Sequence, residues 1–209
     1  MKQINLFILA ISILFFAPSC SKDDPIPEED QEEVGIATLV FTEVKRELHE
    51  GHYHYHDIEG AETISVKFEG KDLAPPVNAH LHLKVDKSYR LELKSTDFLG
   101  RESQQTFVDR AETHQAFILG DETGSLEYEY ADQDANGKTV NVGVTGYLTV
   151  RKEADIFVLR YVLRHLNPGV KENIKASDWN NKDFTKFTGA NDLDLEVPVH
   201  LVHEGDHDH

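Results

Sequence analysis

Most apolar residues of the chain fall in short runs in which apolar and polar positions alternate, and Gly, Asp, Asn and Pro separate these runs. Alternation is typical of half-buried β-strands, because successive side chains of a strand project to opposite faces of the sheet. The chain is therefore predicted to be all-β, with a single helical turn in 177–184 capped by Ser177. The nine candidate strands are 36–44, 62–68, 79–85, 88–94, 115–119, 126–130, 140–150, 156–166 and 193–202.

Many short strands separated by turns favour a sandwich or a barrel. Our first interpretation is an immunoglobulin-like antiparallel β-sandwich of about nine strands, with an eight-stranded, calycin-like barrel around a ligand cavity as the alternative. The clearest topological signal lies in 126–150, where two alternating runs flank Asn136 and Gly137. An Asn-Gly pair supplies the left-handed conformers of a tight turn, so this segment is predicted to be a hairpin.

The N-terminal twenty residues carry one lysine, then an apolar run over 4–17, then Pro-Ser-Cys20. This order is typical of an export signal, and the run is shorter than the roughly 20 residues of a membrane-spanning helix. Cys20 is the only cysteine, and Ala-Pro-Ser-Cys resembles the lipobox of bacterial lipoproteins, with Ala17 in place of the usual leucine. We expect a signal peptide over 1–19, a tether lipidated at Cys20 over 20–34, one β domain over 35–204 and a His/Asp tail over 205–209.

The charge of the chain is strongly negative. Loss of the signal removes Lys2 from the 21 basic residues and none of the 38 acidic ones, so the formal net charge moves from -17 to -18. Such a field repels phosphates and anionic surfaces and attracts cations. Nucleic acid is therefore an unexpected partner, and a divalent metal ion is an expected one.

Twelve histidines are present, and several alternate along predicted strands. Residues i and i+2 of a strand share a face, so two such imidazoles can approach one ion. We predict that ten of them bind metal, zinc by preference with copper or nickel as alternatives. These ten are His49, His52, His54, His56, His80, His82, His200, His203, His207 and His209. The isolated His114 and His165 are interpreted as hydrogen-bonded structural residues.

Neither alternating group completes a coordination sphere by itself. In 79–83, three apolar side chains are predicted to point inward, which leaves His80 and His82 on the outer face. In 49–56, the three histidines of one parity supply one wall of a site. A shared site therefore requires other strands or loops to bring further ligands.

The turn of the predicted hairpin resembles the start of a calcium loop, because Asp132, Asp134 and Asn136 precede Gly137. A complete loop carries a bidentate glutamate at its twelfth position, which is Gly143 here. Turn geometry selects the same residue types. The turn is therefore the favoured interpretation and calcium the alternative.

Signatures of catalysis do not occur in the sequence. It contains no H-E-x-x-H pair, no G-x-S-x-G elbow and no phosphate-binding glycine loop. We therefore expect a protein without enzymatic activity.

Several segments resemble small histidine-rich outer-membrane lipoproteins of Bacteroidota that accompany TonB-dependent receptors. The segments are CSKDD from Cys20, TLVFTE from Thr38, ETHQAFIL from Glu112, DQDANG from Asp132 and DLDLEVPV from Asp192. The resemblance implies a surface-facing lipoprotein of the outer membrane, accessory to metal uptake through a TonB-dependent receptor. Two other hypotheses remain open: a non-catalytic adhesion or interaction module with incidental histidines, and a barrel that binds a small ligand.

Overall fold

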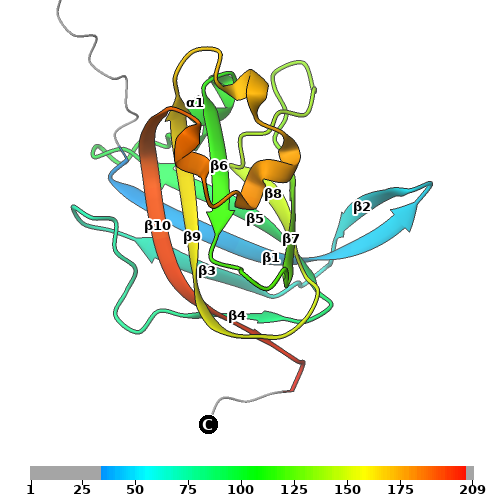
Figure 1. Cartoon of the computed structure of the whole chain (residues 1–209). Helices are drawn as coiled ribbons and strands as arrows, with labels where there is room; N and C mark the ends of the chain where they lie inside the picture. The colour runs from blue at the N-terminus through cyan, green and yellow to red at the C-terminus, as the bar shows by residue number, and fades with distance from the viewer. Residues whose placement is uncertain (1–33, 206–209) are drawn as a thin grey trace, which may run out of the picture. The chain divides into compact units, whose positions relative to one another are not determined.

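A computed structural model describes residues 34–205, which form ten strands in two curled sheets (Figure 1). The predicted all-β class is confirmed, and the two sheets are compatible with a sandwich or a barrel-like fold. The strands are β1 (Ile36–His49), β2 (His52–Asp57), β3 (Thr63–Phe68), β4 (Leu81–Lys84), β5 (Ser88–Thr96), β6 (His114–Leu119), β7 (Leu126–Tyr130), β8 (Thr145–Val150), β9 (Ala154–Leu166) and β10 (Gly189–Val202). The helical elements are α1 (Gln104–Asp109), η1 (Lys171–Asn173), η2 (Ala176–Asn180) and η3 (Phe184–Lys186).

The first sheet has the order β2-β1-β5-β8-β7, with β3 also paired to β1, and the second has the order β4-β10-β9-β6. All pairs are antiparallel except β4 with β10, which is parallel. This pair departs from the wholly antiparallel prediction. Parallel neighbours need a crossover connection, and residues 85–188 separate these two strands in sequence.

The core lies between the inner faces of the two sheets. The inward positions of β1, β5, β9 and β10 alternate along each strand, as in Leu39 and Phe41 or Leu195 and Val197, and these side chains are fully buried. Fully burying such a side chain contributes about 1.5–3 kcal/mol relative to leaving it in water. The second sheet also packs a small outer cluster around Phe117, beneath the 3-10 helices.

The hairpin predicted for 126–150 is present as β7 and β8. Its second strand begins at Thr145 rather than at 140, because Gly143 has a φ of +96° and the chain bends there. In the turn, Gly137 alone has a positive φ, so Asn136 does not take the expected left-handed conformer.

The predicted helical turn is η2, but its N-terminus differs from the prediction. The N-cap is Lys175 and not Ser177, which lies inside the element. The Asp178 carboxylate accepts the backbone N–H of Lys175 at 2.9 Å. A carboxylate three positions into the first turn thus sets the start of the element.

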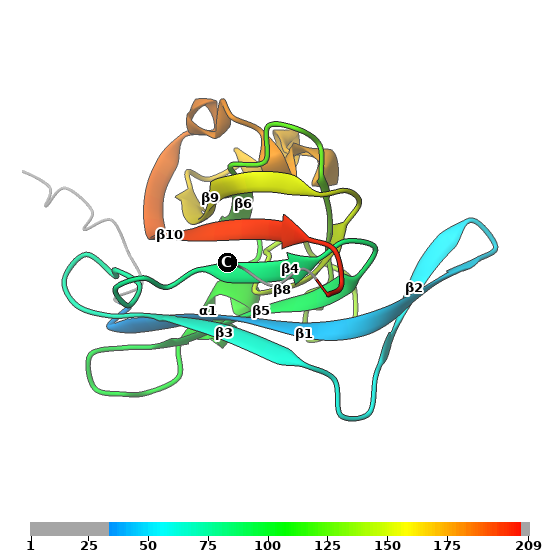
Figure 2. The same ribbon diagram turned by 90° about the horizontal axis from the view of Figure 1, so that it is seen from below.

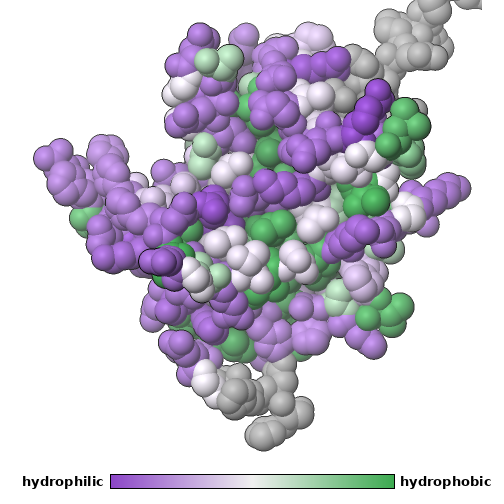
Figure 3. Space-filling model, turned by 180° about the vertical axis from the view of Figure 1, so that it is seen from behind, coloured by the Kyte–Doolittle hydropathy of each residue, from purple (hydrophilic) through white to green (hydrophobic). Residues whose placement is uncertain are grey.

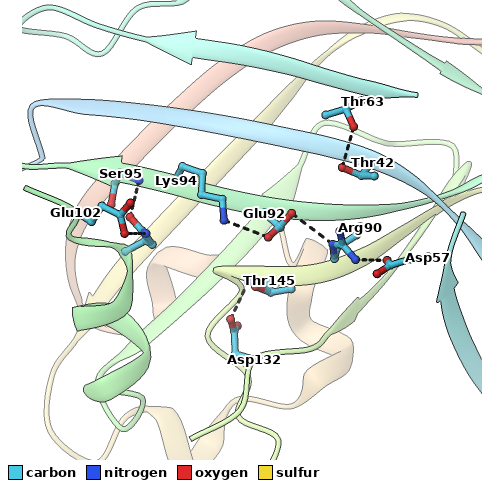
Figure 4. A network of polar contacts seen from close by, with 11 residues as sticks. Thr42, Asp57, Thr63, Arg90, Glu92, Lys94, Ser95, Glu102, Asp132 and Thr145 are labelled. Carbon is cyan, nitrogen blue, oxygen red and sulfur yellow. Dashed lines mark hydrogen bonds and ion pairs between the residues drawn. The ribbon is translucent and has the colours of Figure 1, made fainter. Parts of the chain in front are cut away.

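A short chain of ion pairs lies on the outer face of the first sheet (Figure 4). Lys94 and Arg90 both contact Glu92, and Arg90 also pairs with Asp57 of β2. The face of the molecule shown in Figure 3 is largely hydrophilic, with separate apolar patches. Over 34–205, no helix is long and apolar enough to cross a membrane. The predicted signal peptide, Cys20, the tether before Val34 and the tail histidines His207 and His209 lie outside the described residues.

Candidate metal centre

Three side chains from different strands meet at one end of the second sheet: His114 of β6, His165 of β9 and Asp192 of β10. We call them the His/Asp triad. Register brings the histidines together, because His114 and His165 stand directly opposite each other in the antiparallel pair of β6 and β9. Directly opposite residues share a face of the sheet, and here the two rings lie 4.6 Å apart in an edge-to-face arrangement.

A bulge in β10 supplies the carboxylate. Asn191 stands opposite Arg164 and Leu193 stands opposite Leu163, so Asp192 is an extra residue with no partner across the strand pair. Such a bulge redirects one side chain, and bulges are frequent next to functional sites. In a regular strand Asp192 would share the outer face of Asp194. The bulge lets it point to the same side as His165 instead.

The potential ligand atoms of the triad converge. His114 Nε2 lies 3.2 Å and His165 Nδ1 lies 3.9 Å from Asp192 Oδ2, and one ligand atom from each residue lies within 4.8 Å of the others. Two ligands at a tetrahedral angle around an ion with bonds of about 2.0–2.2 Å are about 3.3 Å apart. The first distance matches this value, and the second is longer than it by about 0.6 Å.

These atoms are buried without hydrogen-bond partners. Such atoms include His114 Nε2, His165 Nδ1 and both carboxylate oxygens of Asp192. A buried polar atom without a partner costs about 1–3 kcal/mol. Four such atoms in one place indicate a site that could hold a cation, which would accept their lone pairs.

The tautomer of His114 sharpens this conclusion. Its Nδ1 lies 3.0 Å from the backbone carbonyl oxygen of Arg110, which can only accept a hydrogen bond. Nδ1 therefore carries the ring proton, and Nε2 of a neutral ring presents a lone pair toward the Asp192 carboxylate. Two facing lone pairs require a positive charge between them, either a second proton on the ring or a metal ion.

The surroundings hold the triad in place. The ring of Phe107 from α1 packs against His114 with a centroid distance of 5.3 Å. On the outer face, the Arg164 guanidinium donates hydrogen bonds to the Asn191 side chain at 2.6 Å and to the Gly189 carbonyl at 2.6 Å, which fixes the start of β10 around the bulge. These contacts limit the movement of His114 and of the backbone on either side of Asp192.

Lys171 fixes the backbone segment that precedes β6. Its ammonium donates hydrogen bonds to the carbonyl oxygens of Ala111 and His114. Burial lowers the pKa of Lys171 to about 8 from a usual value of 10.5. Between these two pH values the unfolded chain binds a proton that the folded chain has lost, so stability rises with pH. We expect the free energy of unfolding to rise by on the order of 3 kcal/mol between pH 8 and 10.5.

Urea unfolding at half-unit pH steps over this interval measures the effect. The Lys171→Met variant is the reference, because it keeps the titrating tyrosines and loses only the ammonium. The free energy of unfolding of the wild type, minus that of Lys171→Met, should rise with pH over this interval. Parallel pH profiles for the two chains would show that Lys171 titrates as an exposed lysine does.

The histidines predicted at 49–56 lie on an arm that β2 and the second half of β1 form outside the body of the sheet (Figures 1 and 2). We call it the histidine arm. Its register places His52, His54 and His56 on one face, as their parity predicted, and adds His49 and Glu47 of β1 to the same face. All four imidazoles are exposed. The ring centroids of His49 and His54 lie 5.8 Å apart, and His56 Nε2 lies 3.6 Å from Glu47 Oε2. On the opposite face, Tyr55 stacks on Tyr147 at 3.8 Å.

A separate group lies on the second sheet, where His82 of β4 and His200 of β10 are neighbours and His80 directly precedes β4. The predicted orientation is confirmed, since Leu81 and Leu83 are fully buried and the histidines face outward. His203 lies beyond the end of β10, with its Nε2 3.5 Å from Glu153. The histidine arm and this group belong to different sheets.

The predicted calcium positions are engaged in other contacts. The buried Asp132 carboxylate accepts the backbone N–H groups of Gly143 at 2.6 Å and Thr145 at 2.7 Å, and burial raises its pKa to about 6. The bond to Thr145 is drawn in Figure 4. Asp134 Oδ1 accepts the N–H groups of Asn136 and Lys138 within the turn. These contacts favour the turn interpretation over a calcium loop.

Sequence reasoning missed the triad because its members share no spacing. One signal was present: His165 lies in the predicted strand 156–166 and His114 stands directly before the predicted strand 115–119, and an imidazole buried in such a place needs a partner. Asp192 gave no such signal, because it continues the alternating acids of β10. Comparisons of the chain with protein-family models, with curated proteins and with solved structures found no match.

Proposed function

We propose that this protein binds a divalent metal ion, zinc by preference, through the His/Asp triad. One observation carries the proposal: two imidazole nitrogens and a carboxylate converge in a buried site without hydrogen-bond partners. A cation satisfies all of them at once. Protonation of His114 satisfies only one pair and leaves His165 Nδ1 unpaired.

The ligand set favours borderline transition metals. Imidazole suits zinc, copper, nickel and iron, and a carboxylate adds one negative charge. Three protein ligands leave a tetrahedral ion one open position. That position opens toward His165, whose side chain is 23% exposed, whereas the side chains of His114 and Asp192 are fully buried. Solvent or a small external ligand completes the sphere from that side.

We further propose a cellular role as a lipid-anchored protein of the outer membrane that assists metal uptake. The signal-like N-terminus ending in Cys20 and the resemblance to lipoproteins that accompany TonB-dependent receptors support this role. The negative charge of the chain supports it as well, because it concentrates cations near the protein. The role is that of a carrier and not of an enzyme.

Calorimetric titration of the untagged full chain with zinc at pH 7.5 tests the metal site. We expect one tight binding event whose affinity falls at least about 100-fold in His114→Ala and in His165→Ala, since each removes one of three ligands. Parallel titrations with nickel, copper(II) and iron(II) rank the metals. X-ray absorption of the zinc-loaded chain should show two imidazoles in the first shell.

A variant of the histidine arm provides the matched control. Replacing His52, His54 and His56 by alanine removes more imidazoles than the triad variants do, but from an exposed face. This variant should keep the tight event. Loss of the tight event in the arm variant, with the event preserved in His165→Ala, would place the site on the arm and refute the proposal.

A further inference from the structure

His80, His82 and His200 form a second cluster of imidazoles, which we call the imidazole patch. His82 and His200 stand opposite each other in the parallel pair of β4 and β10, and His80 lies two residues before His82, directly before the start of β4. The rings of His80 and His82 lie 4.7 Å apart, and those of His82 and His200 lie 5.8 Å apart. The rings of His80, just before β4, and of His200 in β10 thus both adjoin the ring of His82.

The spacing of these rings suits a shared ion. Two imidazoles bound at a tetrahedral angle, with nitrogen-to-metal bonds of about 2.0–2.1 Å, hold their ring centres about 5 Å apart. The two measured separations lie on either side of that value. The ring nitrogens of the three residues do not all lie within 4.8 Å of one another, so an ion would draw them together by rotation of these outward side chains, with no change in the backbone.

Local contacts prepare His80 as a ligand. Its Nδ1 lies 3.0 Å from the carbonyl oxygen of Asn78, so this nitrogen carries the proton and Nε2 presents the lone pair. A hydrogen bond from the distal ring nitrogen to a carbonyl is a usual arrangement for metal-bound histidine. The three rings line a surface pocket of about 460 Å³ together with Ile156 and Pro198. The pocket gives an ion access from solution.

We propose that the imidazole patch is a second, solvent-accessible metal site, distinct from the His/Asp triad, that takes zinc, copper(II) or nickel through imidazole nitrogens alone. Its ligand set is neutral, whereas the triad contributes one carboxylate. His80 is exposed and His82 and His200 are half-buried, so a bound ion meets water directly. Exchange with solution is accordingly faster than at the buried triad.

Zinc titration of the untagged full chain carrying His165→Ala tests the patch. This background disables the triad, so the result does not depend on whether the triad binds metal. We expect a binding event whose affinity falls at least tenfold when His82→Ala or His200→Ala is added. On zinc addition to the His165→Ala chain, the ring NMR signals of His80, His82 and His200 should shift together.

The matched control is His203→Ala, which removes an imidazole just beyond the same strand β10 and should change the affinity less than twofold. The histidine-arm variant should also leave this event in place. An isotherm that His200→Ala leaves unchanged would overturn the proposal. So would an event that disappears with the arm histidines or with His203 instead.

Discussion

Replacing Asp192 by asparagine is expected to stabilise the metal-free chain and to abolish tight zinc binding. In the metal-free protein the Asp192 carboxylate is fully buried, both oxygens lack hydrogen-bond partners, and one faces the lone pair of His114 Nε2. An asparagine amide at this position donates a hydrogen bond to that nitrogen and carries no charge. We expect the free energy of unfolding to rise by about 1–3 kcal/mol in chelator-treated protein.

In the presence of zinc, the wild type should become more stable than Asp192→Asn. A ligand that binds only the folded state at 1,000 times its dissociation constant adds about 4.1 kcal/mol of stability, which exceeds the expected gain of the variant, and the variant loses this stabilisation with its carboxylate ligand. Urea unfolding of both chains with chelator and with zinc measures all four values. If Asp192→Asn destabilises the metal-free chain, the carboxylate is paired with a protonated His114 and the site is an ion pair rather than a metal centre.

Replacing Gly189 by alanine is expected to lower the free energy of unfolding by about 3 kcal/mol or more. Gly189 has a φ of +149°, a conformation that L-residues rarely adopt. A Cβ there would lie 2.0 Å from the carbonyl oxygen of His165 and 2.8 Å from the Cα of Leu166. Both atoms belong to the backbone of β9, so β10 must move away from the strand that carries His165.

The same displacement should weaken zinc binding, because Asp192 follows Gly189 closely in β10. Gly169→Ala is the matched control: its φ is +78°, but nothing lies within 4 Å of the added Cβ. This control should cost only about 1–2 kcal/mol of backbone strain and leave zinc affinity unchanged. Equal losses in the two variants would show that strain alone, and not contact with β9, sets the cost at Gly189.

The local pattern of the sequence predicted most of the strands. Alternation located every described strand except β2, whose histidines and tyrosines are too polar to mark a core face. Alternation also fixed which side chains of β4 point inward, because side-chain direction in a strand depends only on parity. It could not reveal that β4 pairs in parallel with β10, since pairing partners are set by packing of the whole domain.

For the histidines too, local alternation predicted the face of a strand, and strand pairing decided which residues meet. Parity alone placed His52, His54 and His56 on one face of a strand, and the register of β1 and β2 agrees. The gathering of His80 and His82 with His200 needed a strand pair that joins distant parts of the chain. The spacing of residues within one segment shows which side chains share a face of a strand. A metal site needs ligands from several strands, and their pairing is not visible in that spacing.

By itself, the sequence determined an all-β domain with a strongly negative charge and outward-facing histidines, because composition and alternation act locally. Only the tertiary structure decided where His114, His165 and Asp192 meet. Two of them meet through the register of β6 and β9, and the third through a bulge that reverses the face predicted from its neighbours. A bulge is a one-residue change in pairing, and the energies that select it come from the surrounding core and from Arg164.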